Sequence, residues 1–227
     1  MKIGIIVAMS VELDCVKGTL SDLREENIDG SLFYIGHIGN KEIVLTQSGI
    51  GKVCAAIRTV EMIMHYRPDY ILNTGVAGGI DPAMRVMDVV IGGNIVYHDV
   101  WCGEGNEYGQ IQGLPARFHS DPQLVEKAIG IKSDVRIYSG LICSGDKFIT
   151  AREELNRIKA DFPEGMAVDM ESGAIAQVCH MKGIPFISFR IISDTPGVDE
   201  HFAQYTNFWH DAPQKTYNIL KQLLEVL

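Results

Sequence analysis

The sequence lacks the cysteine patterns of a disulfide-stapled or zinc-binding chain. Five cysteines in 227 residues are an odd number, and they are widely spaced with no C-x-x-C pair. A reducing compartment fits them best, so we expect a cytoplasmic protein without disulfides. The positions are Cys15, Cys54, Cys102, Cys143 and Cys179.

Long apolar runs and basic clusters are missing as well. No segment approaches the roughly 20 apolar residues of a membrane span, and the apolar start, MKIGIIVAM, is too short for a signal peptide with its cleavage site. The 20 Lys and Arg are outnumbered by 29 Asp and Glu, which gives a formal net charge of -9. We therefore expect no membrane partner and no nucleic-acid partner, because a phosphate backbone is bound by clustered positive charge.

Several catalytic motifs are absent too. The glycine cluster 75–79 lacks the G-x-G-x-x-G spacing, and 49–52 lacks the spacing of a phosphate-binding loop. The seven histidines show no H-E-x-x-H or other paired metal spacing, and there is no G-x-S-x-G elbow. We expect neither a metal nor any other cofactor.

The sequence does contain an alternation of strands and helices. The predicted strands are 2–7, 42–47, 70–73, 89–97, 135–143, 166–169 and 186–192. The predicted helices are 52–65, 122–129 capped by Asp121, 151–159 behind a capping box of Thr150 and Glu153, and further helices after Glu171 and at the C-terminus. Strands that are apolar on both faces indicate a sheet covered by helices on each side. We predict the α/β class: one domain, 1–227, with three αβα layers around a mixed, mostly parallel, twisted sheet.

Polar residues follow the predicted strands. Ligands bind beyond the carboxyl ends of strands in open α/β sheets, so Glu12, Glu171 and Asp194 are expected to share one crevice. Each also fits a purely structural role. Glu12 would be a helix N-terminal charge behind a Ser10 cap, Glu171 a first-turn acid, and Asp194 a partner of Arg190.

Taken together, the segments resemble the 5'-methylthioadenosine/S-adenosylhomocysteine nucleosidases of the purine nucleoside phosphorylase superfamily, almost from end to end. The matching blocks are 1–6 with Ala8, Met9 and Glu12, then 48–53, 73–79, 97–99, 107–110, 144–149, 167–171 and 190–194. The resemblance implies a nucleoside phosphorylase-like fold. It implies hydrolysis of the N-glycosidic bond of methylthioadenosine and adenosylhomocysteine, with 5'-deoxyadenosine as an open alternative. It also implies a homodimer whose loop at 100–120 reaches into the neighbour's site.

The resemblance assigns roles to the acids. Glu12 would activate the water, Glu171 would hold the ribose hydroxyls, and Asp194 would protonate N7 of the departing adenine. These residue types suit the reaction chemically, because the sugar gains positive charge and the base negative charge as the bond breaks. An acid and a base that flank the scissile bond, with room for water, parallel the inverting glycosidases.

The same resemblance places the substrate-binding residues. Phe148 would stack on adenine, the backbone of Ile149 would read its edge, and Met170 would lie under the sugar. Met9 and Ile50 would line the pocket for the 5' alkylthio group. The remaining predicted contacts are Val76, Ala77, Gly78, Arg190 and Tyr205, with Phe208 as the alternative to Tyr205 for an aromatic wall.

Departures from the family pattern leave alternatives open. Val76 stands where a serine is common, and the stretch 195–201 differs from the usual segment. A nucleosidase for another 5' group, of the futalosine type, is therefore one alternative. Phosphorolysis is a second, but it needs arginines and a hydroxyl around phosphate, where this chain has Glu12 and Val76. A nucleoside-binding sensor is a third, although binding alone needs no carboxylate that activates water.

Overall fold

A computed structural model describes residues 1–197, 200–211 and 213–226. Its strands are β1 (Lys2–Val7), β2 (Ser21–Ile28), β3 (Ser31–Ile38), β4 (Lys41–Gln47), β5 (Tyr70–Gly79), β6 (Val89–Tyr97), β7 (Phe118–His119), β8 (Ile137–Ser144), β9 (Gly165–Asp169) and β10 (Phe186–Asp194). Its helices are α1 (Ser10–Lys17), α2 (Lys52–Tyr66), α3 (Pro122–Ile129), α4 (Arg152–Asp161), α5 (Ser172–Lys182), α6 (His201–Asp211) and α7 (Pro213–Val226). None of these helices is long and apolar enough to cross a bilayer.

The strands form one mixed sheet in the order β10-β6-β8-β9-β5-β1-β4-β3-β2, and β7 pairs with β6. Because β10 also pairs with β5, the strands β5, β9, β8, β6 and β10 form a closed ring. The parallel neighbours β1, β4, β5 and β10 bring their carboxyl ends to the same edge. Residues that are far apart in the sequence therefore meet at one end of the sheet.

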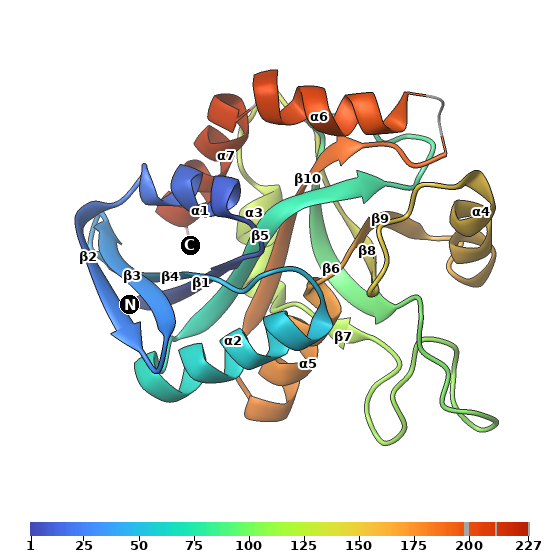
Figure 1. The fold of residues 1–227 in the computed structure, drawn as a ribbon, viewed down its shortest axis with the longest axis horizontal. Coiled ribbons are helices and arrows are strands. Elements are labelled where there is room, and N and C mark those ends of the chain that lie inside the picture. Colours follow the sequence, from blue (N-terminus) through green and yellow to red (C-terminus); the bar gives the residue numbers. More distant parts are fainter. Residues whose placement is uncertain (198–199, 212, 227) are drawn as a thin grey trace.

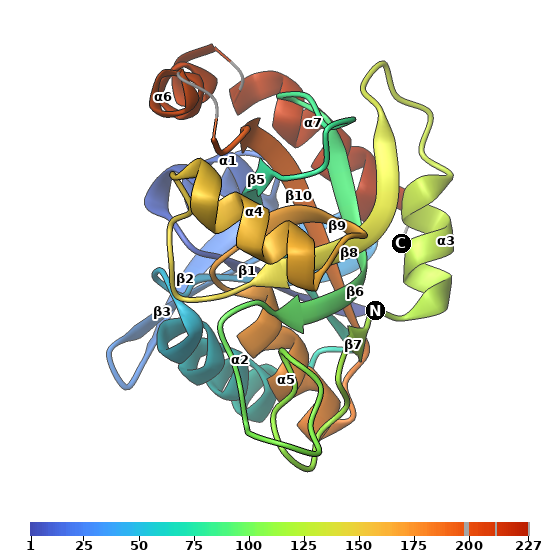
Figure 2. The same cartoon turned by 90° about the vertical axis from the view of Figure 1, so that its right-hand side faces the viewer.

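Helices cover both faces of the sheet. α2 and α5 pack together on one face, whereas α1, α3, α6 and α7 cover the other (Figures 1 and 2). Apolar side chains fill both layers. Met62 of α2 and Ile175 of α5 lie on one side of the sheet, and Leu13, Leu124 and Leu220 lie on the other. Each fully buried side chain of this kind stabilises the fold by about 1.5–3 kcal/mol. The predicted three-layer α/β fold is confirmed.

Three strands, β2, β3 and the short β7, are absent from the sequence prediction, and β5 extends well beyond its predicted end. β2 and β3 were not predicted, because β2 is polar and mostly exposed and shows no apolar alternation. They form a hairpin around Asp29 and Gly30, whose φ angles of 51° and 86° fit the tight turn that an Asp-Gly pair favours. β5 continues to Gly79 instead of ending at 73. The glycines at 75, 78 and 79 are typical of a turn, but they belong to this strand of the sheet.

Helix starts were predicted with mixed success. Asp121 caps α3 as expected, and its carboxylate accepts hydrogen bonds from Gln123 N at 3.0 Å and Leu124 N at 3.1 Å. The predicted Ser10 cap is wrong, because α1 already includes Ser10 and is capped by Met9. The predicted capping box at Thr150 is also wrong, because α4 begins at Arg152, one residue later than predicted, and its N-cap residue is Ala151.

Candidate active site

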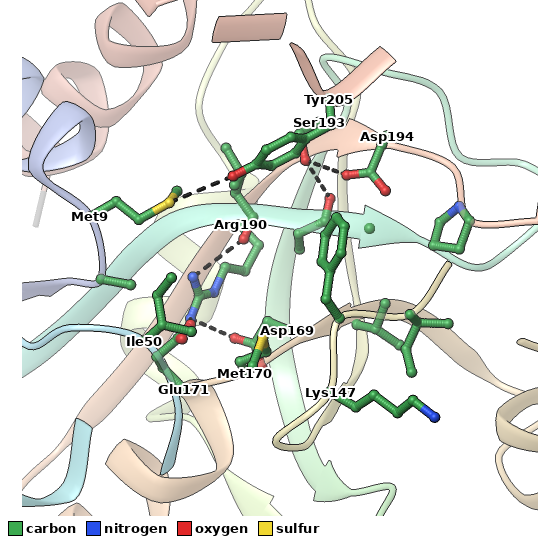
Figure 3. Close-up of a pocket in the computed structure, with 18 of the residues that line it drawn as sticks. Met9, Ile50, Lys147, Asp169, Met170, Glu171, Arg190, Ser193, Asp194 and Tyr205 are labelled. Carbon is green, nitrogen blue, oxygen red and sulfur yellow. Dashed lines mark hydrogen bonds and ion pairs between the residues drawn. The ribbon is translucent and has the colours of Figure 1, made fainter. Parts of the chain in front are cut away.

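A cavity opens where β1, β5, β9 and β10 end. Figure 3 shows side chains from both halves of the chain pointing into it. The predicted site residues all line this one cavity: Met9, Glu12, Ile50, Val76, Ala77, Gly78, Phe148, Ile149, Met170, Glu171, Arg190, Asp194 and Tyr205. Lining residues that were not predicted are Ala8, Lys147, Val168, Asp169, Ser193 and Pro196. Residues 198 and 199 of the divergent stretch 195–201 lie outside the described residues.

Glu12 is held by backbone donors at the end of β1. Its Oε2 accepts hydrogen bonds from Ala8 N at 2.9 Å and Met9 N at 3.0 Å, and its Oε1 accepts one from Val76 N at 3.0 Å. The side chain is 1% exposed. Burial raises its pKa above the ordinary 4.5, against the opposing effects of the Arg190 charge and these N–H groups. Desolvation therefore outweighs the helix N-terminus, and the carboxylate becomes a stronger base.

Gly75 makes room for this carboxylate. Its φ is 150°, and a Cβ at this position would overlap the Glu12 carboxylate and lie 2.9 Å from Arg190 Nη1. The residue lies within β5 and pairs with Arg190 of β10. A side chain would push apart the two charged groups that meet above the strand, so this position needs glycine.

Glu171 is fixed between the start of α2 and Arg190. Its Oε1 accepts a hydrogen bond from Gly51 N at 3.0 Å, and its Oε2 lies 3.6 Å from Arg190 Nη2. Burial raises its pKa to about 7; the Arg190 charge opposes that rise, whereas Asp169 and Glu12 add to it. The alternative role of Glu171, a structural acid in the first turn of a helix, does not fit, because the residue precedes α5 and faces the cavity.

Arg190 is the cation at the centre of these acids. It is 1% exposed, and its Nη2 lies 2.5 Å from Asp169 Oδ2. Arg190 forms ion pairs with Asp169 and Glu171. The alternative structural role of Asp194, as an ion-pair partner of Arg190, is therefore wrong. One guanidinium thus faces three carboxyl groups, and burial raises the pKa of two of them, Glu12 and Glu171.

Asp194 lies across the cavity from Glu171 (Figure 3). It ends β10, is 2% exposed, and its Oδ1 accepts a hydrogen bond from Ser193 Oγ at 2.6 Å. In the register of the sheet it is paired with Gly78 of β5. The Ser193 hydroxyl was missed by sequence analysis, although its place directly before a strand-end carboxylate was a usable signal.

Apolar side chains form the walls and mouth. Phe148 is 45% exposed and Ile50 56% exposed, and both belong to loops. The Phe148 ring lies 5.6 Å from that of Tyr205 at an angle of 63°. The Tyr205 hydroxyl approaches Met9 Sδ at 3.6 Å. Phe208, the sequence alternative to Tyr205, is 3% exposed and packs in the core instead.

Comparison with known proteins identifies the family of this chain. The profile described as Phosphorylase superfamily matches residues 2–225. The 5'-methylthioadenosine/S-adenosylhomocysteine nucleosidase of Actinobacillus succinogenes is 45% identical over 197 residues, which are 86% of each chain. The crystal structure of the nucleosidase of that name from Colwellia psychrerythraea, in complex with adenine, is 36% identical with a TM-score of 0.94, over 100% of this chain and 96% of that one. The futalosine hydrolase of Helicobacter pylori is 28% identical with a TM-score of 0.91, over 100% and 98%. The chain therefore belongs to the 5'-methylthioadenosine/S-adenosylhomocysteine nucleosidases of the phosphorylase superfamily.

Proposed function

We propose that this cavity hydrolyses the N-glycosidic bond of 5'-methylthioadenosine and S-adenosylhomocysteine, releasing adenine and the 5'-substituted ribose. The observation that carries the proposal is the placement of Glu12, Glu171 and Asp194 around one cavity with apolar walls. A nucleoside in this cavity would have one acid beside the base, one beside the sugar hydroxyls and one beside the anomeric carbon. The names of the similar proteins support the same reaction.

The two proton transfers fall to Glu12 and Asp194. As the bond between C1' and the purine nitrogen breaks, its electron pair goes to adenine, whose N7 takes a proton from Asp194. Water forms the new bond to C1' and gives its proton to Glu12. The raised pKa of Glu12 suits it to this task, since a general base works best with a pKa near the working pH. Solvent then restores both acids to their starting charge.

Binding falls to the remaining residues. The Glu171 carboxylate accepts hydrogen bonds from the ribose hydroxyls, Met170 lies under the sugar, and Phe148 stacks on adenine with the backbone of Ile149 at its edge. Met9, Ile50 and Tyr205 enclose the 5' group, while Val76, Ala77 and Gly78 line the sugar side. In support, all of these residues line the cavity. No step of this mechanism needs a cofactor.

The charge of the cavity floor favours hydrolysis over phosphorolysis. Phosphate would have to enter beside Glu12, Asp169 and Glu171, which share the single positive charge of Arg190. Like charges at close range repel, and the low dielectric of a buried site strengthens the repulsion. Water carries no charge and is admitted. A nucleoside sensor would gain nothing from Glu12, a buried carboxyl group whose pKa is raised by burial.

We further propose that the enzyme is a cytoplasmic homodimer. The outer face of α2 exposes Val53 by 69%, Ile57 by 54% and Met64 by 65%, and Trp101, in the loop that follows β6, is 57% exposed. That loop, between β6 and β7, extends from the body beside α5 in both views (Figures 1 and 2). A second copy would cover this apolar face. Light scattering tests the dimer, and replacing Ile57 with aspartate should shift it toward monomer.

Adenine release is the direct test of the reaction. The protein is incubated with 5'-methylthioadenosine, S-adenosylhomocysteine, 5'-deoxyadenosine and futalosine in turn, and the released base is measured by chromatography. We expect free adenine and methylthioribose from the first substrate, at a rate that added phosphate does not raise. A rate that climbs with phosphate and yields a ribose 1-phosphate would identify a phosphorylase. Tight binding without adenine would identify a sensor, and release of base from futalosine alone would identify the other nucleosidase class.

A further inference from the structure

A cluster of buried polar residues lies behind the cavity and does not line it. Asn73 of β5, Ser172 at the start of α5 and Ser188 of β10 are each at most 1% exposed. None of them is among the residues that form the cavity surface. Buried polar groups of this kind are costly unless each is hydrogen-bonded, so their partners show what the cluster does.

Two members of the cluster accept hydrogen bonds from Arg190. Arg190 Nη2 donates to Asn73 Oδ1 at 2.6 Å, and Arg190 Nε and Nη2 reach Ser172 Oγ at 3.3 and 3.2 Å. Ser188 makes no such contact, and its hydroxyl lies 2.8 Å from Ser172 Oγ. Asn73 and Ser172 therefore hold the guanidinium from the side that faces away from the cavity.

Both acceptors are themselves fixed by the fold. Asn73 Nδ2 donates to the Ile6 carbonyl of β1 at 3.1 Å, which turns its oxygen toward Arg190. The backbone N–H of Ser172 donates to Asp169 Oδ2 at 3.1 Å, and its hydroxyl also donates to that carboxylate. The position of the guanidinium is thus set by three elements, β5, α5 and β9, before any substrate arrives.

The placement matters because Arg190 serves several acids at once. Asp169 Oδ2 lies 2.5 Å from Arg190 Nη2 and Glu171 Oε2 lies 3.6 Å from it, while Arg190 Nη1 shares the space above Gly75 with Glu12. Without other acceptors, the guanidinium would move fully onto Asp169, which has the shortest contact. Glu171 and Glu12 would then lose most of the positive charge that opposes the rise of their pKa on burial.

We propose that Asn73 and Ser172 are positioning residues for the reaction, which hold the Arg190 guanidinium where it faces Glu171 and Glu12 as well as Asp169. The inference rests on the proposed function, because it concerns how the carboxylates of that site are kept in their working state. The charged groups that face Glu171 are Arg190 from β10, Asp169 from β9 and Glu12 from α1, together with the N–H of Gly51 at the start of α2.

The test compares Asn73→Ala and Ser172→Ala with the matched control Ser188→Ala. All three remove buried polar atoms from one cluster, but only the first two remove a contact with Arg190. We measure kcat and KM for 5'-methylthioadenosine from pH 5 to 9, with a thermal melt of each variant. For Asn73→Ala and Ser172→Ala we expect the acid limb of kcat/KM to move up by about one pH unit and KM at pH 7 to rise about 10-fold. Ser188→Ala should keep the wild-type profile.

An unshifted acid limb in Ser172→Ala would overturn the proposal, and so would an equal shift in Ser188→Ala, since that would mean general loosening of the cluster. If Asn73→Ala does not fold, Ser172→Ala decides alone, because it removes a single hydroxyl at the first position of a helix. A wild-type protein that releases no adenine would instead refute the proposed function itself, so the two failures are distinguishable.

Discussion

The floor and the mouth of the cavity are built on different principles. On the floor, Glu12, Glu171, Arg190 and Asp194 are at most 5% exposed. They are held by backbone N–H groups, by the Ser193 hydroxyl or by each other. At the mouth, Phe148 and Ile50 are 45% and 56% exposed and belong to loops. The floor is anchored in the sheet, whereas the mouth is attached to the parts of the chain that vary most easily.

This difference separates the reaction from the choice of substrate. Proton transfer requires fixed distances, and a displacement of about 1 Å can cost about 100-fold in rate. Enclosing a 5' substituent requires only apolar area, which a loop or a helix can supply. Relatives named for methylthioadenosine and for futalosine share the fold at TM-scores of 0.94 and 0.91. We infer that the floor determines the chemistry and the mouth determines the 5' group.

The strongest way to break the floor is to remove a proton carrier while keeping its shape. Glu12→Gln and Asp194→Asn should each lower kcat by about 10²- to 10⁴-fold, because a general base or acid contributes that much. KM should change far less, and both variants should still fold. Steady-state kinetics with adenine release check this, with the exposed α3 substitution Glu126→Gln as the matched control. Turnover within a factor of two of the wild type would contradict the assigned role.

A second way is to displace Glu12 without altering it. Gly75→Ala places a methyl group against the Glu12 carboxylate and Arg190 in a backbone conformation that alanine disfavours. We expect a loss of about 100-fold in kcat/KM. Gly39→Ala is the control, since its φ is also positive, at 60°, but open space surrounds it. Equal losses in both variants would mean that backbone strain alone, and not the carboxylate, explains the effect.

The floor should also show in the pH dependence, with opposite signs for stability and binding. Burial raises the pKa of Glu171 from 4.5 to about 7. The native state therefore holds a proton between these values that the unfolded state releases. Its stabilising contribution is complete below pH 4.5 and is lost as pH rises through 7. The ribose hydroxyls need the carboxylate, so kcat/KM should fall about tenfold per pH unit below 7.

Thermal melts and kinetics from pH 5 to 8 check both trends. In Glu171→Gln, both the melting temperature and kcat/KM should depend less on pH than in the wild type. A KM that stays constant across the range would show that the charge of Glu171 does not matter for binding the sugar.

Much of the cavity floor could be predicted from the sequence. Glu12 and Asp194 follow β1 and β10, which both run parallel to β5, so their meeting at one edge of the sheet follows from the topology. Glu171 follows β9, which pairs antiparallel with the end of β5, so its place in the same cavity depends on that pairing. Asp169 was not selected, because it ends an apolar strand and shows no local sign of its partner. That partner, Arg190, is 21 positions further along the chain, and the pair depends on closure of the strand ring that contains both β9 and β10.

Other features were beyond any local pattern. The pairing of β10 with both β5 and β6 closes the strand ring, yet each strand by itself has the same apolar appearance as an open-sheet strand. The glycines of β5 have the composition of a turn, but each lies where another segment comes close to the strand: Glu12 and Arg190 at Gly75, Pro196 and Val168 at Gly78, and Met84 and Ile192 at Gly79. Composition records local preference, whereas these features depend on contacts between distant segments.

The mouth offers the smallest expected effect and the sharpest contrast within one helix. Tyr205 and Phe208 both belong to α6, but Tyr205 lines the cavity and Phe208 packs in the core. Tyr205→Leu should raise KM for 5'-methylthioadenosine about 3- to 10-fold with little change in kcat, since an aromatic contact is worth about 0.5–1.5 kcal/mol. Phe208→Leu should leave KM unchanged and lower stability by about 1 kcal/mol. Kinetics and urea unfolding on both variants measure the two quantities. The reverse pattern, with KM following Phe208 and stability following Tyr205, would place the aromatic wall on the other residue and move the 5' group away from the mouth described above.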